Sequence, residues 1–454
     1  MFVTLTIRGA PAANIWFVRR LVPLIASFTL LAPSCPRDYG PSNYDADATG
    51  SFAPSANADD LVYVSGGSAK GDSDFVVAMP PGEILMRIDG PDRRGWVFAS
   101  PTLAYYPMYR ASANPSNMIH RIDLRTGSRA RIVTDDRAGL PLLDEAGRFD
   151  TGDPGFTALA LTADKAGLLV ARLLNAGPRV WIGRYDALSG KLQAERSWPI
   201  IAIAANVRLA VVGDRLIVVT SAPTDAGSVV QEMRFLDASL GEVAALDTRD
   251  LPADERCSAA LQALDGKGWA TVCAQPEGRH ASFLIFDSGY RIASRIPVKL
   301  EVRERVIAWT AQGGSVAMLT DRARYVRVVG EGDPTSTWLA EPDGRTAVRV
   351  AREITPGIIV AQLVANPTAG SGGETALLEL ATGRVLVRAA GSAIALDFAG
   401  AGDRLYALLP GAEGLGPRLQ RLDRESLAPV GGAAALPQRD DVIVGGLIAV
   451  IPAR

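Results

Sequence analysis

The sequence has 454 residues, 48% of them apolar and 21% charged, so it can bury a large core and is not a disordered or collagen-like polymer. Its 47 Lys and Arg against 49 Asp and Glu give a net charge of -2, which offers no overall attraction for phosphate backbones and argues against nucleic-acid partners. Two histidines and three cysteines are too few for zinc fingers, iron-sulfur clusters or His-rich metal centres. They leave a Ser-His-Asp triad only two candidate bases.

The first 34 residues have the features of an export signal. Arg8, Arg19 and Arg20 occur without any acidic residue, and the apolar residues 21–32 follow them. This apolar stretch of 12 residues is shorter than the roughly 20 that a membrane-spanning helix needs. We therefore expect residues 1–34 to be a cleaved signal peptide, whose removal leaves 44 basic against 49 acidic residues, a net charge of -5.

The end of this segment, Ala-Pro-Ser-Cys at residues 32–35, resembles the lipobox of bacterial lipoproteins. The resemblance implies that Cys35 is acylated and becomes the new N-terminus, and that Pro36 after it directs the protein to an outer membrane where the organism has one. Residues 35–60 are dense in Pro, Ser, Asn, Asp and Ala, which is typical of a flexible spacer. The alternative is an ordinary signal-peptidase site followed by an incidental cysteine.

From residue 61 onward the sequence predicts strands rather than helices. No run free of both Gly and Pro exceeds 15 residues, which leaves little room for long helices. The apolar segments are short, rich in Val, Ile, Ala and Leu, and bounded by turn residues, as at residues 216–220 and 283–286. We expect an all-β domain over residues 61–454.

A strand, an acidic or small turn and a second strand recur seven times. The turns contain Asp123, Asp186, Asp237, Asp287, Asp343, Thr382 and Asp423. In such a hairpin the Asp side chain accepts hydrogen bonds from the backbone N–H groups of the turn, and Gly takes the positive φ. A less regular hairpin precedes most copies, as at residues 208–220, so two hairpins make a four-stranded unit with a period of about 40–54 residues.

This repeat resembles bacterial β-propellers of the quinoprotein-like and YVTN-like kind, over essentially all of residues 61–454. The resemblance implies a seven-bladed β-propeller of four-stranded antiparallel sheets, with eight blades as the alternative. An irregular β-sandwich or a β-solenoid stays open, because such hairpins occur in any β protein. No Asp-x-x-Gly hairpin follows residues 442–451, and residues 61–64 and 75–79 lack a preceding partner strand, so we expect the two ends of the chain to share and close one blade.

Cys257 and Cys273 flank a segment that predicts a hairpin. If residues 264–266 form a three-residue loop, Ala263 faces Lys267 and Cys257 falls opposite Cys273. Cross-strand neighbours are within disulfide reach, and an exported location permits oxidation. The sequence therefore predicts a structural disulfide, with two buried reduced thiols as the alternative.

The common catalytic motifs are missing from the sequence. It contains no Gly-x-Gly-x-x-Gly, Walker, Gly-x-Ser-x-Gly or His-Glu-x-x-His motif. Residues 185–198 are similar to the docking repeat of pyrroloquinoline quinone enzymes, but Trp198 comes four residues late. We therefore assign no cofactor, no catalytic residue and no metal-ligand set, and expect His120 and His280 to be surface or edge residues.

Tyr105, Tyr106 and Tyr109 form the densest aromatic cluster. Core packing is the default interpretation of these tyrosines. The alternative is a ligand or partner surface near the entrance of the propeller, because tyrosine is favoured where one end of a side chain stays wet.

These features favour an exported, lipid-anchored propeller that acts as a binding or scaffold module in the cell envelope. Its partner would be a protein or an envelope polymer, and only the N-terminal lipid would contact the membrane. We expect it to be anchored in the outer membrane and to face the periplasm or the surface. The alternative is an exported propeller enzyme, lactonase-like or quinoprotein-like, with a divalent metal or quinone in the central channel.

Overall fold

The computed structural model describes residues 57–452 except for segments 69–70, 90–96, 101–102, 108–117, 124–128, 134–157, 175–178, 200–205, 224–228, 248, 265–267, 277, 331, 340–345, 366–372, 412–415 and 437–442. All described residues belong to one compact unit, Ala46–Arg454. The predicted signal peptide and Cys35 lie outside them. Every regular element of the described part is a β-strand, and this part contains no helix long and apolar enough to cross a membrane.

The strands form eight antiparallel sheets, which we number as blades. Blade 1 consists of β33 (Ile443–Pro452), β1 (Asp60–Ser68), β2 (Gly71–Met79) and β3 (Glu83–Asp89). Blade 2 consists of β4 (Val97–Ser100), β5 (Leu103–Pro107), β6 (Met118–Asp123) and β7 (Arg129–Val133). Blade 3 consists of β8 (Ala158–Leu161), β9 (Gly167–Leu174), β10 (Arg179–Asp186) and β11 (Leu192–Pro199). Blade 4 consists of β12 (Asn206–Val212), β13 (Arg215–Pro223), β14 (Val229–Leu236) and β15 (Glu242–Leu246).

The second half of the chain continues this order. Blade 5 consists of β16 (Arg256–Cys257), β17 (Gln262–Ala263), β18 (Trp269–Ala274), β19 (His280–Phe286) and β20 (Ile292–Lys299). Blade 6 consists of β21 (Val306–Gln312), β22 (Ser315–Thr320), β23 (Arg324–Val329) and β24 (Thr335–Trp338). Blade 7 consists of β25 (Ala347–Thr355), β26 (Ile358–Val364), β27 (Gly373–Glu379) and β28 (Arg384–Ser392). Blade 8 consists of β29 (Asp397–Ala401), β30 (Arg404–Leu409), β31 (Arg418–Leu422) and β32 (Pro429–Ala435).

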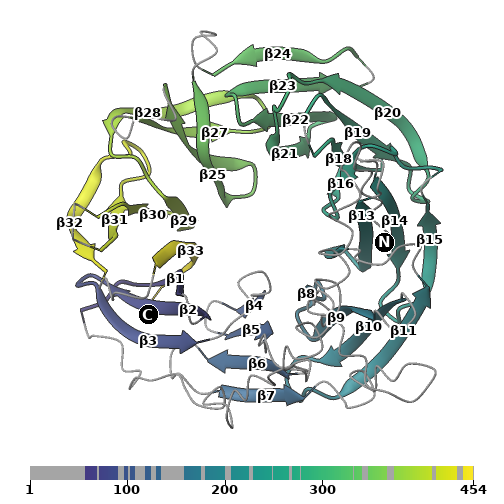
Figure 1. Cartoon of the computed structure of the whole chain (residues 1–454), viewed down its shortest axis with the longest axis horizontal. Helices are drawn as coiled ribbons and strands as arrows, with labels where there is room; N and C mark the ends of the chain where they lie inside the picture. The colour runs from purple at the N-terminus through teal and green to yellow at the C-terminus, as the bar shows by residue number, and fades with distance from the viewer. Residues whose placement is uncertain are drawn as a thin grey trace, which may run out of the picture. The chain divides into compact units, whose positions relative to one another are not determined.

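The first strands of successive blades contact one another, which gathers them around a common centre (Figure 1). Contacts join β4 with β8, β8 with β12, β17 with β21, β21 with β25, β25 with β29, and β29 with β33. Blades 1 and 2 meet through the edge-to-face pair Tyr63 and Phe98. The domain is therefore an eight-bladed β-propeller, in which the first strand of blade 5 is divided into β16 and β17, both paired with β18.

The expected count of seven blades is wrong, and the alternative of eight is observed. Six of the seven predicted hairpins join the third and fourth strands of blades 2, 3, 4, 5, 7 and 8. Asp343, assigned to the remaining hairpin, comes instead between β24 of blade 6 and β25 of blade 7, outside the described residues. The true turns of blades 1 and 6, residues 80–82 and 330–334, lack the Asp-x-x-x-Gly pattern, so the repeat did not reveal them.

Asp side chains stabilise the repeated turns as predicted. The Asp186 Oδ1 atom accepts hydrogen bonds from the backbone N–H groups of Leu188 and Ser189, at 3.2 and 2.7 Å. The hydrogen bonds from Ser189 lower the pKa of Asp186. Gly190 takes the positive φ of this turn, at 71°.

The turn of Asp237 distributes these roles differently. Here Leu240, and not the glycine, takes the positive φ, at 67°. Gly241 is required for another reason, because a Cβ atom on it would lie 2.6 Å from the Asp237 Oδ2 atom. The predicted role of glycine therefore holds in some copies and is wrong in this one.

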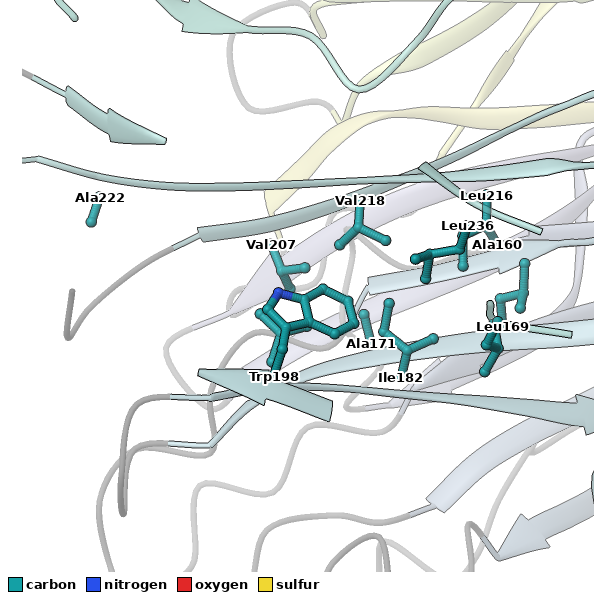
Figure 2. Close-up of a cluster of buried hydrophobic side chains, with 12 residues drawn as sticks. Ala160, Leu169, Ala171, Ile182, Trp198, Val207, Leu216, Val218, Ala222 and Leu236 are labelled. Carbon is teal, nitrogen blue, oxygen red and sulfur yellow. The ribbon is translucent and has the colours of Figure 1, made fainter. Parts of the chain in front are cut away.

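The hydrophobic core lies between the faces of neighbouring blades. Figure 2 shows one layer, in which Trp198 of blade 3 packs near Val207 and Val218 of blade 4. Because each blade is covered on both faces, β22 is buried at every position. The outermost strand β20 instead alternates exposed and half-buried residues over most of its length.

The two ends of the chain meet in blade 1, where β1 and β33 pair antiparallel with Leu61 opposite Ile451. This closure by terminal strands was predicted from the sequence. A buried carboxylate holds blade 1 to blade 8, since Asp60 in β1 accepts hydrogen bonds from Arg404 Nη1 and the Tyr406 hydroxyl of β30, both at 2.6 Å. Burial, followed by the hydrogen bond to Asp60, raises the pKa of Tyr406 far above its ordinary value, so the hydroxyl stays a proton donor.

Deletion of residues 441–454 should abolish cooperative unfolding or lower the free energy of unfolding by more than about 4 kcal/mol. The deletion exposes β1 along its whole length and removes the buried side chains of Leu447 and Val450. Chemical denaturation followed by circular dichroism measures the effect. Deletion of residues 453–454 alone, which leaves β33 intact, is the control. Equal stability of both variants would refute the role of closure.

Tyr406→Phe should lower the free energy of unfolding by about 1.5–3 kcal/mol, because it removes a hydrogen bond to a buried carboxylate. Tyr325→Phe is the matched control. The Tyr325 hydroxyl is also buried, but it makes no hydrogen bond within the described residues, so its removal should change stability little. Denaturant titration measures both variants. Equal losses of unfolding free energy would show that the hydrogen bond from Tyr406 to Asp60 does not stabilise the domain.

Candidate functional site

The predicted disulfide between Cys257 and Cys273 is confirmed. The two residues lie directly opposite each other in β16 and β18. The predicted loop, however, is wrong, because Ala263 faces Trp269 and not Lys267. The loop is two residues longer than expected, which shifts the pairing in one direction. The segment between β16 and β17 holds two residues more than the part of β18 opposite it, which shifts the pairing back, so Cys257 still faces Cys273.

Gln231 of blade 4 fixes the chain just before this disulfide. Its Oε1 atom accepts a hydrogen bond from the backbone N–H of Cys257 at 3.1 Å. Its Nε2 group donates to the carbonyl oxygens of Pro252 and Glu255, at 3.1 and 2.8 Å. The connection from β15 to β16 is thereby held at a defined position beside β18 and β19.

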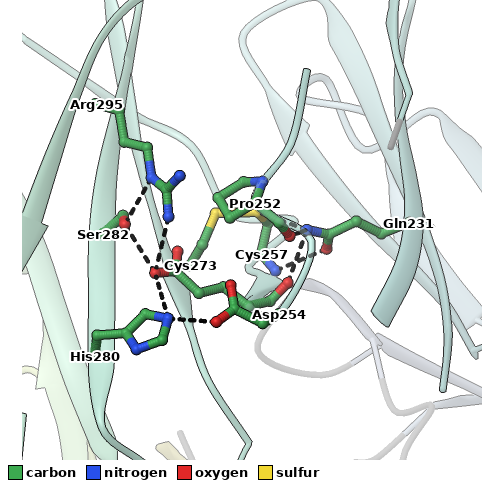
Figure 3. Close-up of polar contacts among 9 residues, drawn as sticks. Gln231, Pro252, Asp254, Cys257, Cys273, His280, Ser282 and Arg295 are labelled. Carbon is green, nitrogen blue, oxygen red and sulfur yellow. Dashed lines mark hydrogen bonds and ion pairs between the residues drawn. A yellow bond between two sulfur atoms is a disulfide. The ribbon is translucent and has the colours of Figure 1, made fainter. Parts of the chain in front are cut away.

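Cross-strand register brings Glu255 beside His280. Cys273 opposes both Cys257 in β16 and Ser282 in β19. The residues two positions before these, Glu255 just ahead of β16 and His280 at the start of β19, therefore lie at the same level of the sheet. The Nε2 atom of His280 lies 2.7 Å from Asp254 Oδ2 and 3.6 Å from Glu255 Oε1 (Figure 3). The sequence suggested that His280 was only a surface or edge residue, and the structure gives it two carboxylate neighbours.

Glu255 is fully buried, and its Oε1 atom has several polar contacts. Ser282 Oγ donates to it at 2.9 Å and Arg295 Nη2 at 3.2 Å. Burial raises the pKa of Glu255, while the hydrogen bond from Ser282 and the charges of Arg295 and His280 oppose this rise. Ligand atoms of Asp254, Glu255 and His280 all lie within 4.8 Å of one another, and within the described residues no other group of three His, Cys, Asp or Glu side chains is so arranged.

A second feature lies at the same end of blade 5, where the β18–β19 turn meets the β20–β21 connection. A cleft of about 420 Å³ is lined by Pro276, Arg279, Val302, Arg303 and Arg305. All three arginine side chains are exposed. None of them forms an ion pair with a carboxylate of the described residues.

Gly278 allows the two segments to approach each other. Its φ is +63°, and a Cβ atom on it would lie 2.1 Å from the carbonyl oxygen of Glu304. The backbone N–H of Arg303 donates to the carbonyl of Gly278 at 3.1 Å, and that of Leu300 donates to the carbonyl of Arg279 at 2.8 Å. These close backbone contacts bring Arg279 and Arg303 to one cleft.

Neighbouring arginines of blade 6 are neutralised by carboxylates. Arg322 Nη1 lies 2.6 Å from Glu301 Oε2, and Arg324 Nη2 lies 2.8 Å from the buried Glu304 Oε2. Burial alone would raise the pKa of Glu304, but hydrogen bonds from Arg324 and the backbone of Glu301 lower it overall. These acids therefore pair with Arg322 and Arg324, and the three arginines of the cleft form no ion pair with them.

The predicted aromatic cluster is only partly described. Tyr105 is buried in the core between blades 2 and 3, and its hydroxyl donates to the carbonyl of Ala187 at 2.6 Å. Burial raises the pKa of Tyr105. Tyr106 lies in β5, with its side chain outside the described set, as is all of Tyr109. A ligand surface formed by these two residues stays a prediction.

The sequence interpretation missed both features of this end of blade 5. A signal for the carboxylate–histidine cluster was present, since extending the predicted Cys257–Cys273 pairing through the next hairpin aligns Glu255 with His280. No comparable signal marks the cleft, because its arginines are brought together by contacts between the connections of two blades.

No protein-family model matches the sequence, and no curated protein is similar to it. Several solved propellers are similar in structure. The computationally designed protein Ika8 is 14% identical with a TM-score of 0.43, over 78% of this chain and 93% of that chain. A 6-phosphogluconolactonase-like protein of Bacteroides fragilis is 11% identical with a TM-score of 0.41, over 88% and 99%. BamB of Moraxella catarrhalis is 11% identical with a TM-score of 0.34, over 70% and 79%. At such scores these likenesses carry no argument about activity or partners.

Replacing both Cys257 and Cys273 by Ala should lower the free energy of unfolding by about 3 kcal/mol, the entropic effect expected for a closed loop of this length. Denaturant titration of the oxidised protein and of the variant measures the difference. Cys35→Ser, which leaves the pair intact, is the control. A variant as stable as the oxidised protein would show that the disulfide does not stabilise blade 5.

Proposed function

We propose that this chain is an exported β-propeller that acts as a binding module and holds an acidic segment of a partner protein in the cleft of Arg279, Arg303 and Arg305. The observation that supports this is the gathering, in one concave site, of three exposed arginines that form no ion pair within the described part of the chain. Guanidinium groups match the geometry of carboxylates and bind them through paired hydrogen bonds. The chain without its predicted leader has a net charge of -5, so the cleft is a local exception to the charge of the molecule.

Val302 favours a protein segment over a purely anionic polymer. Its side chain is 60% exposed although it is apolar, and it lies in the wall of the cleft with the arginines. A peptide that combines acidic and apolar side chains could neutralise the arginines and cover Val302 at the same time. A sulfated or phosphorylated polymer would satisfy only the charges.

The sequence and the disulfide support an extracytoplasmic location. Disulfides persist in oxidising compartments, and residues 1–34 have the composition of an export signal. The proposal includes acylation of Cys35, with residues 35–60 as the spacer between a membrane and the propeller. The chain would then act as an envelope-anchored scaffold, held in the outer membrane by its lipid and presenting blades 5 and 6 to its partner.

Arg279→Gln combined with Arg303→Gln and Arg305→Gln should weaken binding of an acidic peptide of alternating Glu and Leu by about tenfold or more. Fluorescence anisotropy of the labelled peptide with the full chain measures this at low salt, where the affinity should be highest. The charge-matched control is Lys191→Gln, Arg291→Gln and Arg384→Gln, which changes three exposed cations at the opposite ends of the strands. It should alter the affinity less than twofold.

Two outcomes would overturn the proposal. Equal binding by the cleft variant and the wild type would show that the three arginines are not the site. Dextran sulfate binding at the cleft more tightly than the peptide would identify an anionic polymer as the ligand class.

A further inference from the structure

We infer that Asp254, Glu255 and His280 form a binding site for a divalent transition metal ion of the zinc class, a role separate from the proposed binding of an acidic partner. The site lies where the β15–β16 connection meets the first residue of β19. Two carboxylates and one imidazole are ligands that zinc accepts in proteins.

The distances from His280 to the two carboxylates can be compared with those around such an ion, and all three ligand atoms lie within 4.8 Å of one another. Zinc bonds of about 2.0–2.2 Å place neighbouring tetrahedral ligand atoms roughly 3.3–3.5 Å apart. The His280 Nε2 atom lies 3.6 Å from Glu255 Oε1, close to this spacing. Its distance of 2.7 Å to Asp254 Oδ2 is shorter. The Asp254 side chain is 46% exposed, so it can move outward by the roughly 0.6–0.8 Å that coordination requires.

The second argument comes from Glu255 itself. Its side chain is fully buried, and its Oε2 atom receives no hydrogen bond from the described residues. A buried carboxylate oxygen without a donor costs free energy, and a cation bound by both oxygens of Glu255 would remove that cost. This buried carboxyl group lies beside a second acid, Asp254, and a histidine, His280.

Arg295 is the competitor of the metal ion. Its Nη2 atom lies 3.2 Å from Glu255 Oε1, and its side chain is 46% exposed. Two carboxyl groups, those of Asp254 and Glu255, face the single guanidinium of Arg295, so acidic groups outnumber the arginine in this cluster. A divalent ion can therefore bind while Arg295 swings toward solvent, and the exposed side of the cluster admits water as the remaining ligand.

The test is calorimetric titration of the full chain, carried out with Cys35→Ser so that no free thiol binds the metal. We expect one zinc ion per chain and a rise in Tm. His280→Gln and Asp254→Asn should each weaken zinc binding at least tenfold. His120→Gln is the matched control for the other histidine and should leave it unchanged. Bound Co²⁺ should show a visible absorption band that is lost in His280→Gln.

Arg295→Gln distinguishes a metal site from a purely structural ion-pair network. If the cluster binds metal, removal of the competing cation should strengthen zinc binding severalfold. If the cluster is only a network, the variant should lose stability and bind no zinc. The inference would be overturned by absence of zinc binding to the wild-type chain at about 100 µM zinc, where a dissociation constant of about 1 µM or tighter saturates the site, or by zinc binding that His280→Gln leaves intact.

Discussion

The pairing of β1 with β33 is the constraint on which the other blades depend. Each blade buries both faces against its neighbours, so an incomplete blade 1 would expose the cores of blades 8 and 2 as well. Asp397 of β29 extends this coupling, since its carboxylate accepts hydrogen bonds from the backbone N–H of Leu447 at 2.9 Å and from Arg352 Nε at 2.7 Å. One side chain thereby joins blades 7, 8 and 1. The pairing of β1 with β33 links residues far apart in the sequence, so it can form only once both ends of the domain are present.

The sequence predicted the strands and the closure because both follow from local patterns. Short apolar runs between turn residues identified the strands, and two runs without partners identified the shared blade. The number of blades could not be predicted in the same way, because turns of different sequence connect the third and fourth strands of a blade. Asp186 accepts the N–H groups of its turn, whereas residues 80–82 turn with Pro-Pro-Gly, in which Gly82 has a φ of +94°. A search for turns with Asp therefore misses the Pro-Pro-Gly turn. It also includes Asp343, which follows the last strand of blade 6 and does not connect two strands of one blade.

In the candidate site, too, one part could be predicted from the sequence and another could not. Cys257 and Cys273 were paired correctly although the loop between them was not, because pairing of two positions depends on the sum of loop and bulge lengths. From that pairing the neighbourhood of Glu255 and His280 could have been derived by counting along three strands. The arginine cleft could not, since Arg279 and Arg303 meet only because Gly278 allows the backbone of Glu304 to approach.

Arg279 and His280 are adjacent in the sequence, yet they contribute to features of opposite charge. Arg279 lies in the turn before β19 and His280 is the first residue of that strand, so one short segment contributes to both features. Arg279 lines the cleft with the β20–β21 connection, while His280 contacts Asp254 of the β15–β16 connection. Both features therefore lie at the same end of blade 5, and adjacent residues of the chain contribute to them. An acidic partner in the cleft would contact Arg279, and a cation would be held by His280, so the two proposed ligands use the side chains of different residues.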